Sequence, residues 1–365
     1  MKITRVEPFV VHVPLRLPID DSSSHVTHWG VPGVILHTDE GISGTGYTGT
    51  HAIGDELIFG IIRDHYGPRL LGKDPFNVRQ IWTDLHREPL HWIGRVGLTT
   101  MAHAAIDIAL WDIMAKASGR PLWQLLGGDK PERIATYNTD GGWLNWSQDQ
   151  LVEDCRRMVG QGWRGIKIKL GKPDPAEDLR RVAAVRGAIG DEIKLMVDVN
   201  QRWDLHTART WGRRLADHDV YWLEEPIHPD DLEGHALLAR ELTTPIATGE
   251  HIYSAFGFRD LIARQAIAFV QVDATRVAGI TETLTITNLA AAHNLPVVPH
   301  ISDMMQVHQH IVAAFPNAPM LEYIPWLLEL FEEPVRMEGG SIVTPTAPGA
   351  STTMRADSLA RWRVA

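Results

Sequence analysis

The stretch GWRGIKIKLGKP, residues 162–173, alternates like a β-strand, but two of its polar positions carry an unexpected side chain. Lys167 and Lys169 are two residues apart, so they lie on the same face of such a strand. Neighbouring ammonium groups are ordinary on a solvent-exposed face and costly in a core. The stretch therefore raises the question of what the lysine face meets. The residues of the opposite, apolar face are Ile166, Ile168 and Leu170.

Seven other short apolar segments have the same character, and segments of helical length separate most of them. Eight strand–helix repeats over roughly 200 residues are typical of a (β/α)8 barrel. An open doubly wound sheet is the alternative, but no GxGxxG motif follows any expected strand and eight units exceed what that fold usually needs. The expected strands are IATYNT (134–139), GIKIKL (165–170), IKLMVDVN (193–200), YWLEEP (221–226), PIATGE (245–250), FVQVDA (269–274), PVVPH (296–300) and APMLEY (318–323).

The chain on either side of these repeats has a different pattern. Strands followed by helices over the first 120 or so residues indicate an α+β unit. The tail from about residue 326 contains the strand-like segment SIVTP and a stretch rich in Pro and Gly, and we expect it to pack on the first domain. The expected N-terminal strands are 2–13 and 33–48, and the expected helices are 52–66, 75–87 and 97–117.

The composition argues against several classes of function. Of 365 residues 45 are acidic and 35 are basic, and the net charge of −10 without a basic run argues against nucleic acid or an anionic membrane as the main partner. No segment approaches the ~18 apolar residues of a membrane span, and the first residues do not resemble a signal peptide. The single cysteine, Cys155, cannot form an intrachain disulfide, and a cytoplasmic location is the simplest expectation.

An ionisable residue ends every expected strand from the second to the eighth. Because the carboxyl ends of barrel strands meet at one rim, these side chains are expected to converge on one site. Capping of the following helix explains any single acidic residue of this kind, but seven successive cases are harder to explain that way. The residues are Lys167, Lys169, Asp198, Glu224, Glu250, Asp273, His300 and Glu322.

Three of these carboxylates come from consecutive strands. Unpaired, Asp198, Glu224 and Glu250 would repel one another at the rim, and a divalent cation would remove the conflict. Ligands that are all oxygen favour Mg²⁺, with Mn²⁺ as the alternative, over Zn²⁺. Asn200 shares a strand face with Asp198 and is a candidate to reach the site.

Candidate bases flank this metal site. Lys169 precedes the carboxylates and the His300–Asp273 pair follows them, which suggests proton transfer at a substrate carbon held between the two. A metal that chelates a carboxylate stabilises the enediolate formed when the α-proton leaves. We expect Lys167 and the metal to lower the pKa of Lys169 toward neutrality, and we expect Glu322 to hydrogen-bond the oxyanion as a neutral acid.

These residues lie in motifs that together resemble the enolase superfamily and, within it, the mandelate racemase subgroup. The run AHAAIDIALWDIMAKASGRPLWQLLGG, residues 102–128, resembles the segment that joins the capping domain to the barrel in that family. The resemblance spans nearly the whole chain. The shorter motifs are the Lys-x-Lys of IKIK, DVN with Asp198, EEP with Glu224 first, GE with Glu250, QVDATRVAGITE with Asp273, PH with His300 and LEY with Glu322.

The resemblance implies an α/β fold, a modified TIM barrel of the (β/α)7β type over residues 126–325. Residues 1–125 would form an α+β capping domain, on which the C-terminal segment 326–365 packs. The resemblance also implies a homo-oligomer, either a dimer or an octamer. The implied site is Mg²⁺ on Asp198, Glu224 and Glu250, opposed acid/base catalysts in Lys169 and His300–Asp273, Lys167 tuning Lys169, and Glu322 as the partner of the substrate carboxylate.

Removal of an α-proton from a carboxylate leaves several reactions open. We favour Mg²⁺-dependent dehydration of a sugar acid, an aldonate or aldarate, to a 2-keto-3-deoxy acid. Racemisation or epimerisation of a 2-hydroxy acid and cycloisomerisation of a sugar-acid lactone are alternatives, and a non-catalytic barrel is a remote one. The loop LPIDDSSSHVTHWGVPG, residues 17–33, closes over the barrel mouth by resemblance, and its polar groups suit a polyhydroxylated substrate. Its candidate substrate contacts are His25 and Trp29.

Several other polar or aromatic residues have weaker signals. His251 should point away from Glu250 if the strand continues, and His308 and His310 lack the spacing of a metal pair on a helix, so structural roles are expected for all three. Further candidates for substrate contact are Arg95, Trp143 and Trp146, although tryptophan in a barrel is more often part of the core.

Overall fold

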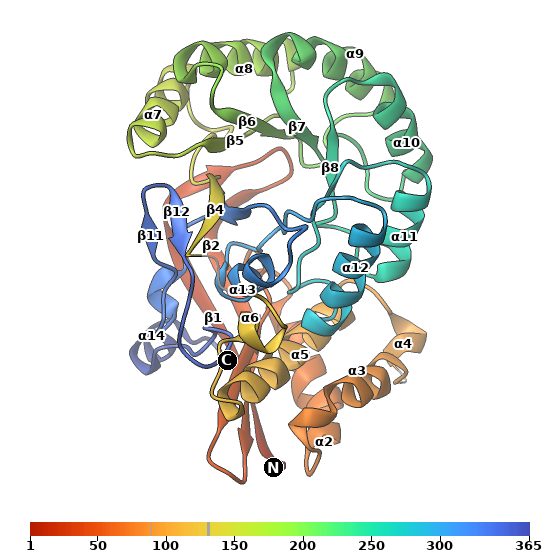
Figure 1. Cartoon of the computed structure of the whole chain (residues 1–365), viewed down its shortest axis with the longest axis vertical. Helices are drawn as coiled ribbons and strands as arrows, with labels where there is room; N and C mark the ends of the chain where they lie inside the picture. The colour runs from red at the N-terminus through yellow and green to blue at the C-terminus, as the bar shows by residue number, and fades with distance from the viewer. Residues whose placement is uncertain (89, 130–131) are drawn as a thin grey trace.

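The computed structural model describes residues 1–88, 90–129 and 132–365. A parallel sheet curls into a barrel in the upper part of Figure 1, with helices around its outside. The sheet closes because the last barrel strand pairs in parallel with the first, and Val270 and Val297 form a parallel bridge where the seventh strand was expected. The barrel strands are β4 (Arg133–Asn138), β5 (Gly165–Lys169), β6 (Lys194–Asp198), β7 (Val220–Glu224), β8 (Ile246–Thr248), β9 (Phe269–Val270) and β10 (Leu321–Tyr323).

The helices of the barrel cover the apolar faces of these strands. Ile166, Ile168 and Leu170 of the opening stretch are buried in the core between sheet and helices, so Lys167 and Lys169 point into the barrel. The lysine face therefore meets an interior site and not solvent. The helices are α7 (Gln148–Gly160), α8 (Pro175–Ile189), α9 (Leu205–Leu215), α10 (Leu232–Glu241), α11 (Ala255–Ala263), α12 (Ile280–Ala292) and α13 (Gln306–Ala314).

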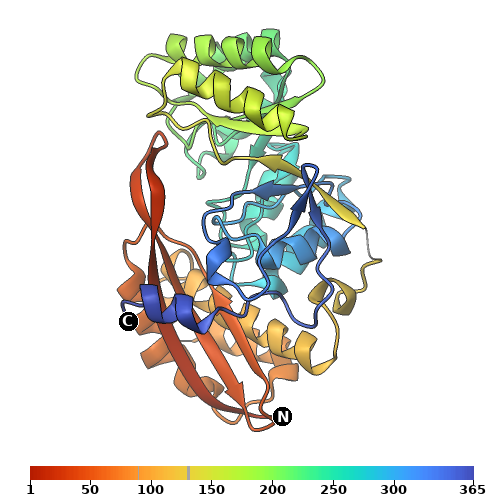
Figure 2. The same ribbon diagram turned by 90° about the vertical axis from the view of Figure 1, so that its left-hand side faces the viewer.

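The N-terminal domain is an antiparallel sheet, β1 (Ile3–Asp20), β2 (His25–Thr38) and β3 (Ser43–Tyr47), covered by helices on one face. Residues 17–33 differ from the expected loop, because most of them belong to a long β1–β2 ribbon that turns at 21–24 (Figure 2). The tip of the ribbon contacts the barrel, where the hydroxyl of Ser22 donates to the carbonyl of Val199 over 2.6 Å. The other helical segments are α1 (Asp55–Gly60), η1 (Ile61–Tyr66), α2 (Gly67–Leu70), η2 (Pro75–Asn77), α3 (Val78–His86), α4 (Leu90–Ile93), α5 (Leu98–Ala117), α6 (Leu122–Leu125), η3 (Ala216–His218) and η4 (Leu328–Leu330).

Helix α5 joins the two domains and is buried on nearly every side. It lies directly on the sheet because strand β3 presents glycine there, and a Cβ on Gly46 would sit 1.9 Å from the carbonyl oxygen of Ala105. On its other side, Asp107 accepts hydrogen bonds from the backbone and hydroxyl of Thr281 in the first turn of α12. Burial raises the pKa of Asp107 to about 7. The apolar run at 102–128 is thus the seam between capping domain and barrel.

The C-terminal segment contacts both domains. Strand β12 (Ser341–Val343) pairs with β11 (Met337–Glu338) and with barrel strand β4, whereas helix α14 (Ala356–Trp362) lies along β1 (Figures 1 and 2). The chain end is fixed there, since the backbone N–H of Val364 donates to the carbonyl of Val10 over 2.8 Å. Within the described residues, no helix has both the length and the apolar character required to cross a membrane.

Candidate active site

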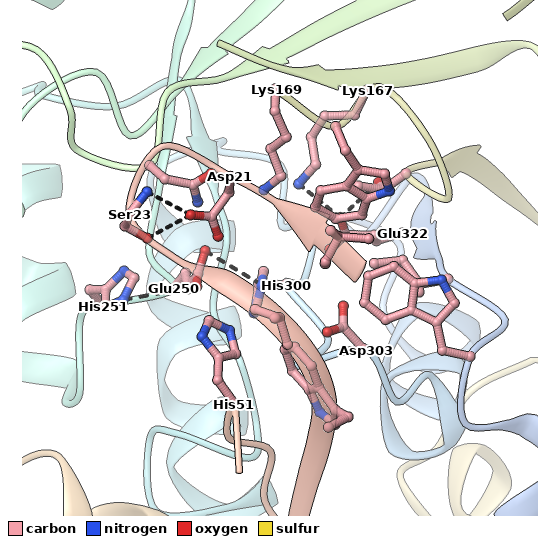
Figure 3. A pocket seen from close by; sticks show the side chains of 18 of the residues that line it. Asp21, Ser23, His51, Lys167, Lys169, Glu250, His251, His300, Asp303 and Glu322 are labelled. Carbon is pink, nitrogen blue, oxygen red and sulfur yellow. Dashed lines mark hydrogen bonds and ion pairs between the residues drawn. The ribbon is translucent and has the colours of Figure 1, made fainter. Parts of the chain in front are cut away.

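A cavity lies at the carboxyl ends of the barrel strands, beneath the tip of the β1–β2 ribbon (Figure 3). Strand register places its polar groups, because Lys169 on β5 lies beside Asp198 on β6, which in turn lies beside Glu224 on β7. Glu250, His300 and the other rim residues follow the ends of later strands. The cavity is lined by Ile19, Asp21, Ser23, Val26, Trp29, His51, Thr139, Trp143, Lys167, Lys169, Asn200, Gln201, Glu250, His251, Arg276, His300, Asp303, Glu322, Ile324 and Trp326.

Each of the two lysines has carboxylate partners of its own. Lys167 Nζ lies 2.7 Å from Glu224 Oε1 and 2.8 Å from Glu322 Oε1, and Lys169 Nζ lies 2.6 Å from Asp198 Oδ2. Burial lowers the pKa of Lys169, but Asp198 outweighs it and raises that pKa above its ordinary range. The neighbouring carboxylate has a larger effect on this pKa than the neighbouring ammonium. The expected lowering includes the charge of a metal ion and stays a prediction.

Glu322 lies at the cavity wall, where cationic side chains affect the pKa of its carboxyl group. Burial raises the pKa of its carboxyl, but Lys167 and His300 reverse the effect and leave that pKa below its ordinary value. Thr139 donates to Glu322 Oε1 over 2.8 Å, while Oε2 is buried without a hydrogen-bond partner among the described residues. Glu322 therefore accepts hydrogen bonds at the cavity wall, and its expected role as a neutral acid against the oxyanion stays a prediction.

His300 and Asp273 form a hydrogen-bonded pair across the loops that follow β9 and Val298. His300 Nδ1 lies 2.7 Å from Asp273 Oδ2, and His300 Nε2 lies 3.4 Å from Glu250 Oε2. Burial lowers the pKa of His300, but the two carboxylates reverse this and raise the pKa to about 9. The Asp273 contact leaves Nε2 free to exchange a proton with a bound molecule.

Asp273 has several further contacts that the sequence did not reveal. The hydroxyls of Thr275 and Ser302 donate to it over 2.7 and 2.6 Å. His308, which was expected only to pack, has its Nε2 atom 3.2 Å from Asp273 Oδ1. His308 is on helix α13 and is fully buried. These contacts fix the carboxylate that orients His300. His310 instead lies outside the cavity and its Nε2 bonds Ser351 Oγ over 3.1 Å.

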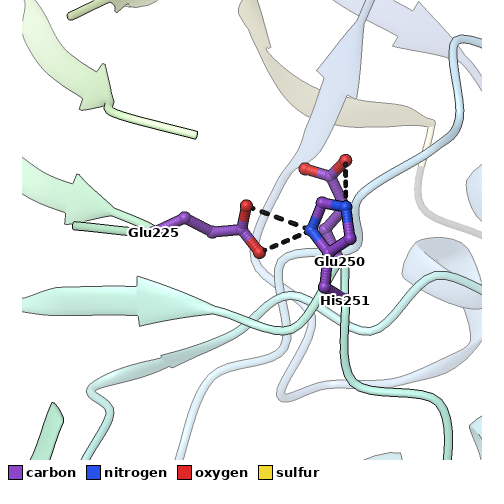
Figure 4. Close-up of side chains that lie close together, drawn as sticks. All are labelled: Glu225, Glu250 and His251. Atoms are coloured by element: carbon purple, nitrogen blue, oxygen red, sulfur yellow. Dashed lines mark hydrogen bonds and ion pairs between the residues drawn. The ribbon is translucent and has the colours of Figure 1, made fainter. Parts of the chain in front are cut away.

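Two sets of side chains at the rim could hold a cation, and they share Glu250. Ligand atoms of Glu225, Glu250 and His251 lie within 4.8 Å of one another (Figure 4). His251 was expected to point away from the site, yet it lines the cavity, because β8 ends at Thr248 and strand alternation does not continue to residue 251. Its Nδ1 atom lies 2.9 Å from Glu225 Oε1.

The second set is the oxygen-only group Asp198, Glu224 and Glu250. Asp198 and Glu224 are almost completely buried, and they face the lysines from adjacent strands. Burial, together with the charge of Asp198, raises the pKa of Glu224 to about 7 even though Lys167 opposes the shift. Asp198 and Glu224 are therefore neighbours on adjacent strands, and the three-carboxylate metal site stays a prediction.

Of the residues suggested as substrate contacts, some line the cavity and others do not. Trp29, Trp143 and Asn200 line the cavity, and the side-chain Oδ1 of Asn200 is buried without a partner among the described residues. His25 does not line it; the side chain is 63% exposed and pairs with Asp20 on the outer side of the ribbon. Arg95 and Trp146 also lie outside the lining. Sequence reasoning missed Asp303, His51, Gln201, Arg276, Trp326 and, as an individual contact, Asp21.

The fold and site define a capped parallel α/β barrel with carboxylates, lysines and a histidine at the carboxyl ends of its strands. Residues 150–358 match the family described as enolase C-terminal domain-like, and residues 4–127 match the mandelate racemase / muconate lactonizing enzyme N-terminal domain. The chain therefore belongs to the enolase superfamily, in the mandelate racemase / muconate lactonizing enzyme subgroup.

Known relatives include enzymes that act on different sugar acids. The chain is 38% identical to L-talarate/galactarate dehydratase of Salmonella typhimurium, over 99% of this chain and 91% of the relative. It is 32% identical to arabinonate dehydratase of Saccharolobus solfataricus, over 88% and 87%. A crystal structure of L-talarate dehydratase from a Polaromonas species, complexed with Mg and L-glucarate, superposes with a TM-score of 0.92 at 37% identity and covers 100% of this chain and 98% of that one.

Proposed function

We propose that the chain is a Mg²⁺-dependent dehydratase of a sugar acid. The observation that carries the proposal is that Lys169 and His300 line one cavity, each held by its own carboxylate, with Glu250 beside the histidine (Figure 3). Such a pair can remove a proton from one carbon and deliver a proton to a leaving group on the next. Similarity to sugar-acid dehydratases supports this reaction over others.

The residues present fit Mg²⁺, and we assign Asp198, Glu224 and Glu250 as its ligands. All three are oxygen donors; Asp198 and Glu224 are buried, and a hard cation would relieve the repulsion between these two. The set that contains His251 is less suited, because Mg²⁺ prefers oxygen to imidazole. When bound, the ion supplies positive charge for the carboxylate of the substrate. Mn²⁺ is the alternative ion.

Lys169 is the proposed base. Its Nζ accepts the proton bound to the α-carbon, and the electron pair of that C–H bond is delocalised onto the substrate carboxylate. To act in this way Lys169 must first lose a proton. Asp198 now holds that proton in place through a hydrogen bond from Lys169 Nζ, and a cation held by Asp198 would weaken this hold. Lys167, fixed between Glu224 and Glu322, provides the adjacent positive charge.

His300 is the proposed general acid. Its Nε2 donates a proton to the β-hydroxyl group, the C–O bond breaks, and the hydroxyl leaves as water. The enol that remains tautomerises to a 2-keto-3-deoxy acid, so atoms and charge balance without an oxidant. Asp273 keeps the imidazole oriented and stabilises its protonated form.

The same residues could serve other reactions of this subgroup. Proton return from His300 to the α-carbon would racemise or epimerise a 2-hydroxy acid, and loss of a ring oxygen would cycloisomerise a lactone. Product analysis distinguishes these outcomes. The enzyme with Mg²⁺ is incubated with a panel of aldonates and aldarates, and each mixture is scored for 2-keto-3-deoxy acid and for epimer. Formation of a keto acid supports dehydration, and formation of an epimer alone supports epimerisation. If none of the substrates in the panel gives a product, the proposal is contradicted.

A further inference from the structure

Asp303 is a buried carboxyl group in the cavity that the proposed reaction does not use. It follows His300 by three residues, in the loop that leads to α13, and Figure 3 shows it beside His300 and below Glu322. Ser302 and Asp303 both have positive φ values, of 41° and 59°, so the backbone turns sharply there. This turn directs the carboxyl into the cavity, where it forms part of the lining.

The carboxyl of Asp303 lacks a partner within the chain. The residue is 7% exposed, and no hydrogen bond or ion pair to it is present among the described residues. A buried carboxyl without hydrogen bonds is costly, and this cost is recovered when a bound molecule provides donors. Burial also raises the pKa of Asp303 to about 7, in agreement with a site that lacks an internal partner.

Positive charge in the cavity is already matched by carboxylates of the chain. Arg276 Nη2 lies 3.4 Å from Glu250 Oε1, and the two lysines, His300 and His251 have acidic partners described above. His51 is the remaining basic side chain of the lining, and burial lowers its pKa, which favours the neutral imidazole. Each of these cationic side chains therefore has an acidic partner within the chain, whereas no ion pair to Asp303 is present among the described residues.

The wall near Asp303 suits a neutral polyol chain. Trp326 lies between Trp29 and Trp143, with ring centroids 6.1 and 5.3 Å away, so the three indoles form a continuous apolar wall. Asp21, at the tip of the ribbon, adds a second acidic group and accepts the backbone N–H groups of Ser23 and Ser24. The aromatic rings can pack against the C–H groups of a sugar chain, and the carboxylates can accept hydrogen bonds from its hydroxyl groups.

We propose that Asp303 is a substrate-binding residue that accepts hydrogen bonds from hydroxyl groups beyond the reacting carbons, and that it selects aldonates over aldarates. The inference rests on the proposed function and deepens it by naming the substrate class. An aldonate ends in a hydroxymethyl group that can donate to Asp303. An aldarate of the same configuration ends in a second carboxylate, which would be placed among Asp303, Asp21 and the tryptophans.

The test compares matched substrates that differ only at the terminal carbon, such as galactonate with galactarate and gluconate with glucarate. For the wild-type enzyme with Mg²⁺, kcat/KM for the preferred aldonate should exceed that for its aldarate by roughly tenfold or more, as expected for a hydrogen bond to a charged group. Asp303→Asn should lower kcat/KM for the aldonate by roughly 10- to 100-fold, mainly through KM, and should bring the two substrates closer together. Asp260→Asn, which removes a charge from the exposed face of α11, is the control and should change neither value.

Higher wild-type activity on the aldarates, or an unchanged aldonate-to-aldarate ratio in Asp303→Asn, would overturn the inference while leaving the dehydratase assignment intact. Failure of Asp303→Asn to fold leaves the wild-type ratio as the decisive value. If the enzyme converts neither aldonates nor aldarates, the proposed dehydratase function fails, but the inference about Asp303 is not yet decided. Calorimetric titration of the wild-type enzyme and Mg²⁺ with the same pairs then tests the inference, and tighter aldarate binding counts against it.

Discussion

His300 Nδ1 lies 2.7 Å from Asp273 Oδ2, and this contact turns Nε2 of the imidazole toward Glu250 and the cavity. Asp273 is itself held by Thr275, Ser302 and His308. The ring of His300 therefore has a fixed orientation when it acts as an acid, and the neutral imidazole that remains keeps its proton on Nδ1.

Replacement of His300 by asparagine should separate the two proton transfers. We expect His300→Asn to lower kcat for dehydration by roughly 10²- to 10⁴-fold, because the leaving hydroxyl loses its acid. Exchange of the α-proton with solvent should persist, because Lys169 is unchanged. NMR of the substrate recovered from deuterium oxide measures the exchange, and Mg²⁺ titration should show that the ion still binds. His310→Asn, a buried histidine outside the cavity, is the control. Unimpaired dehydration by His300→Asn would refute the role.

The two candidate donor sets can be separated by their effect on metal affinity. Asp198→Asn and Glu224→Gln should each weaken Mg²⁺ binding by about tenfold or more, because each removes a negatively charged ligand. Glu225→Gln and His251→Asn should change it by much less. Mn²⁺ binding, followed by electron paramagnetic resonance, gives a direct comparison of the four variants. The reverse order would place the ion at Glu225, Glu250 and His251.

Stability should fall in mild acid partly because of His310. Burial lowers the pKa of His310 to about 3, so the folded chain keeps this imidazole neutral while the unfolded chain protonates it near pH 6.5. The stability that depends on the neutral form is complete above pH 6.5 and is lost as pH falls toward 3. The loss attributable to His310 is about 2 kcal/mol at pH 5.

Urea unfolding at pH 7.5 and pH 5 measures this loss. His310→Asn should show a smaller difference between the two pH values than wild type, whatever its stability at neutral pH. His293→Asn, at an exposed position, should keep the wild-type difference. An equal pH dependence in wild type and His310→Asn would show that His310 does not contribute.

The expected homo-oligomer has a candidate contact surface on the capping domain. Ile53, Trp92 and Ile93 are 79%, 93% and 82% exposed, which is unusual for large apolar side chains. We expect a double variant, Trp92→Ser with Ile93→Ser, to have a lower molar mass in light scattering than wild type. Phe256→Ser, on α11 of the barrel, serves as the comparison. Identical molar masses for all three proteins would exclude this surface.

The pattern of the sequence predicted those features that depend on regular strands. In IKIK the two-residue alternation places both lysines on one face, and the repeat spacing brings Asp198 and Glu224 together on adjacent strands. Irregular backbone was not predictable in this way. Gln201, Glu225 and Asp303 have φ values of 66°, 39° and 59°, and each turns its side chain in a direction that strand alternation does not describe.

Pairing between residues that are distant in the sequence was also not predictable from the sequence pattern. Residues 17–33 read as a polar loop because serines and aspartates favour turns, whereas antiparallel pairing extends β1 and β2 almost to the tip. The pKa of Lys169 likewise depends on the 2.6 Å contact with Asp198, which spacing places nearby without giving its distance. Charge partners, and with them the direction of a pKa shift, become known only from the folded chain.

The central claim is that Lys169 removes the α-proton of a sugar acid. The most direct measurement is deuterium incorporation at that carbon, in deuterium oxide with Mg²⁺, by wild type, Lys169→Ala and the surface control Lys194→Ala. We predict exchange or turnover by wild type and Lys194→Ala, and a loss of roughly 10³-fold or more in Lys169→Ala with the metal still bound. Undiminished exchange by Lys169→Ala would contradict the account.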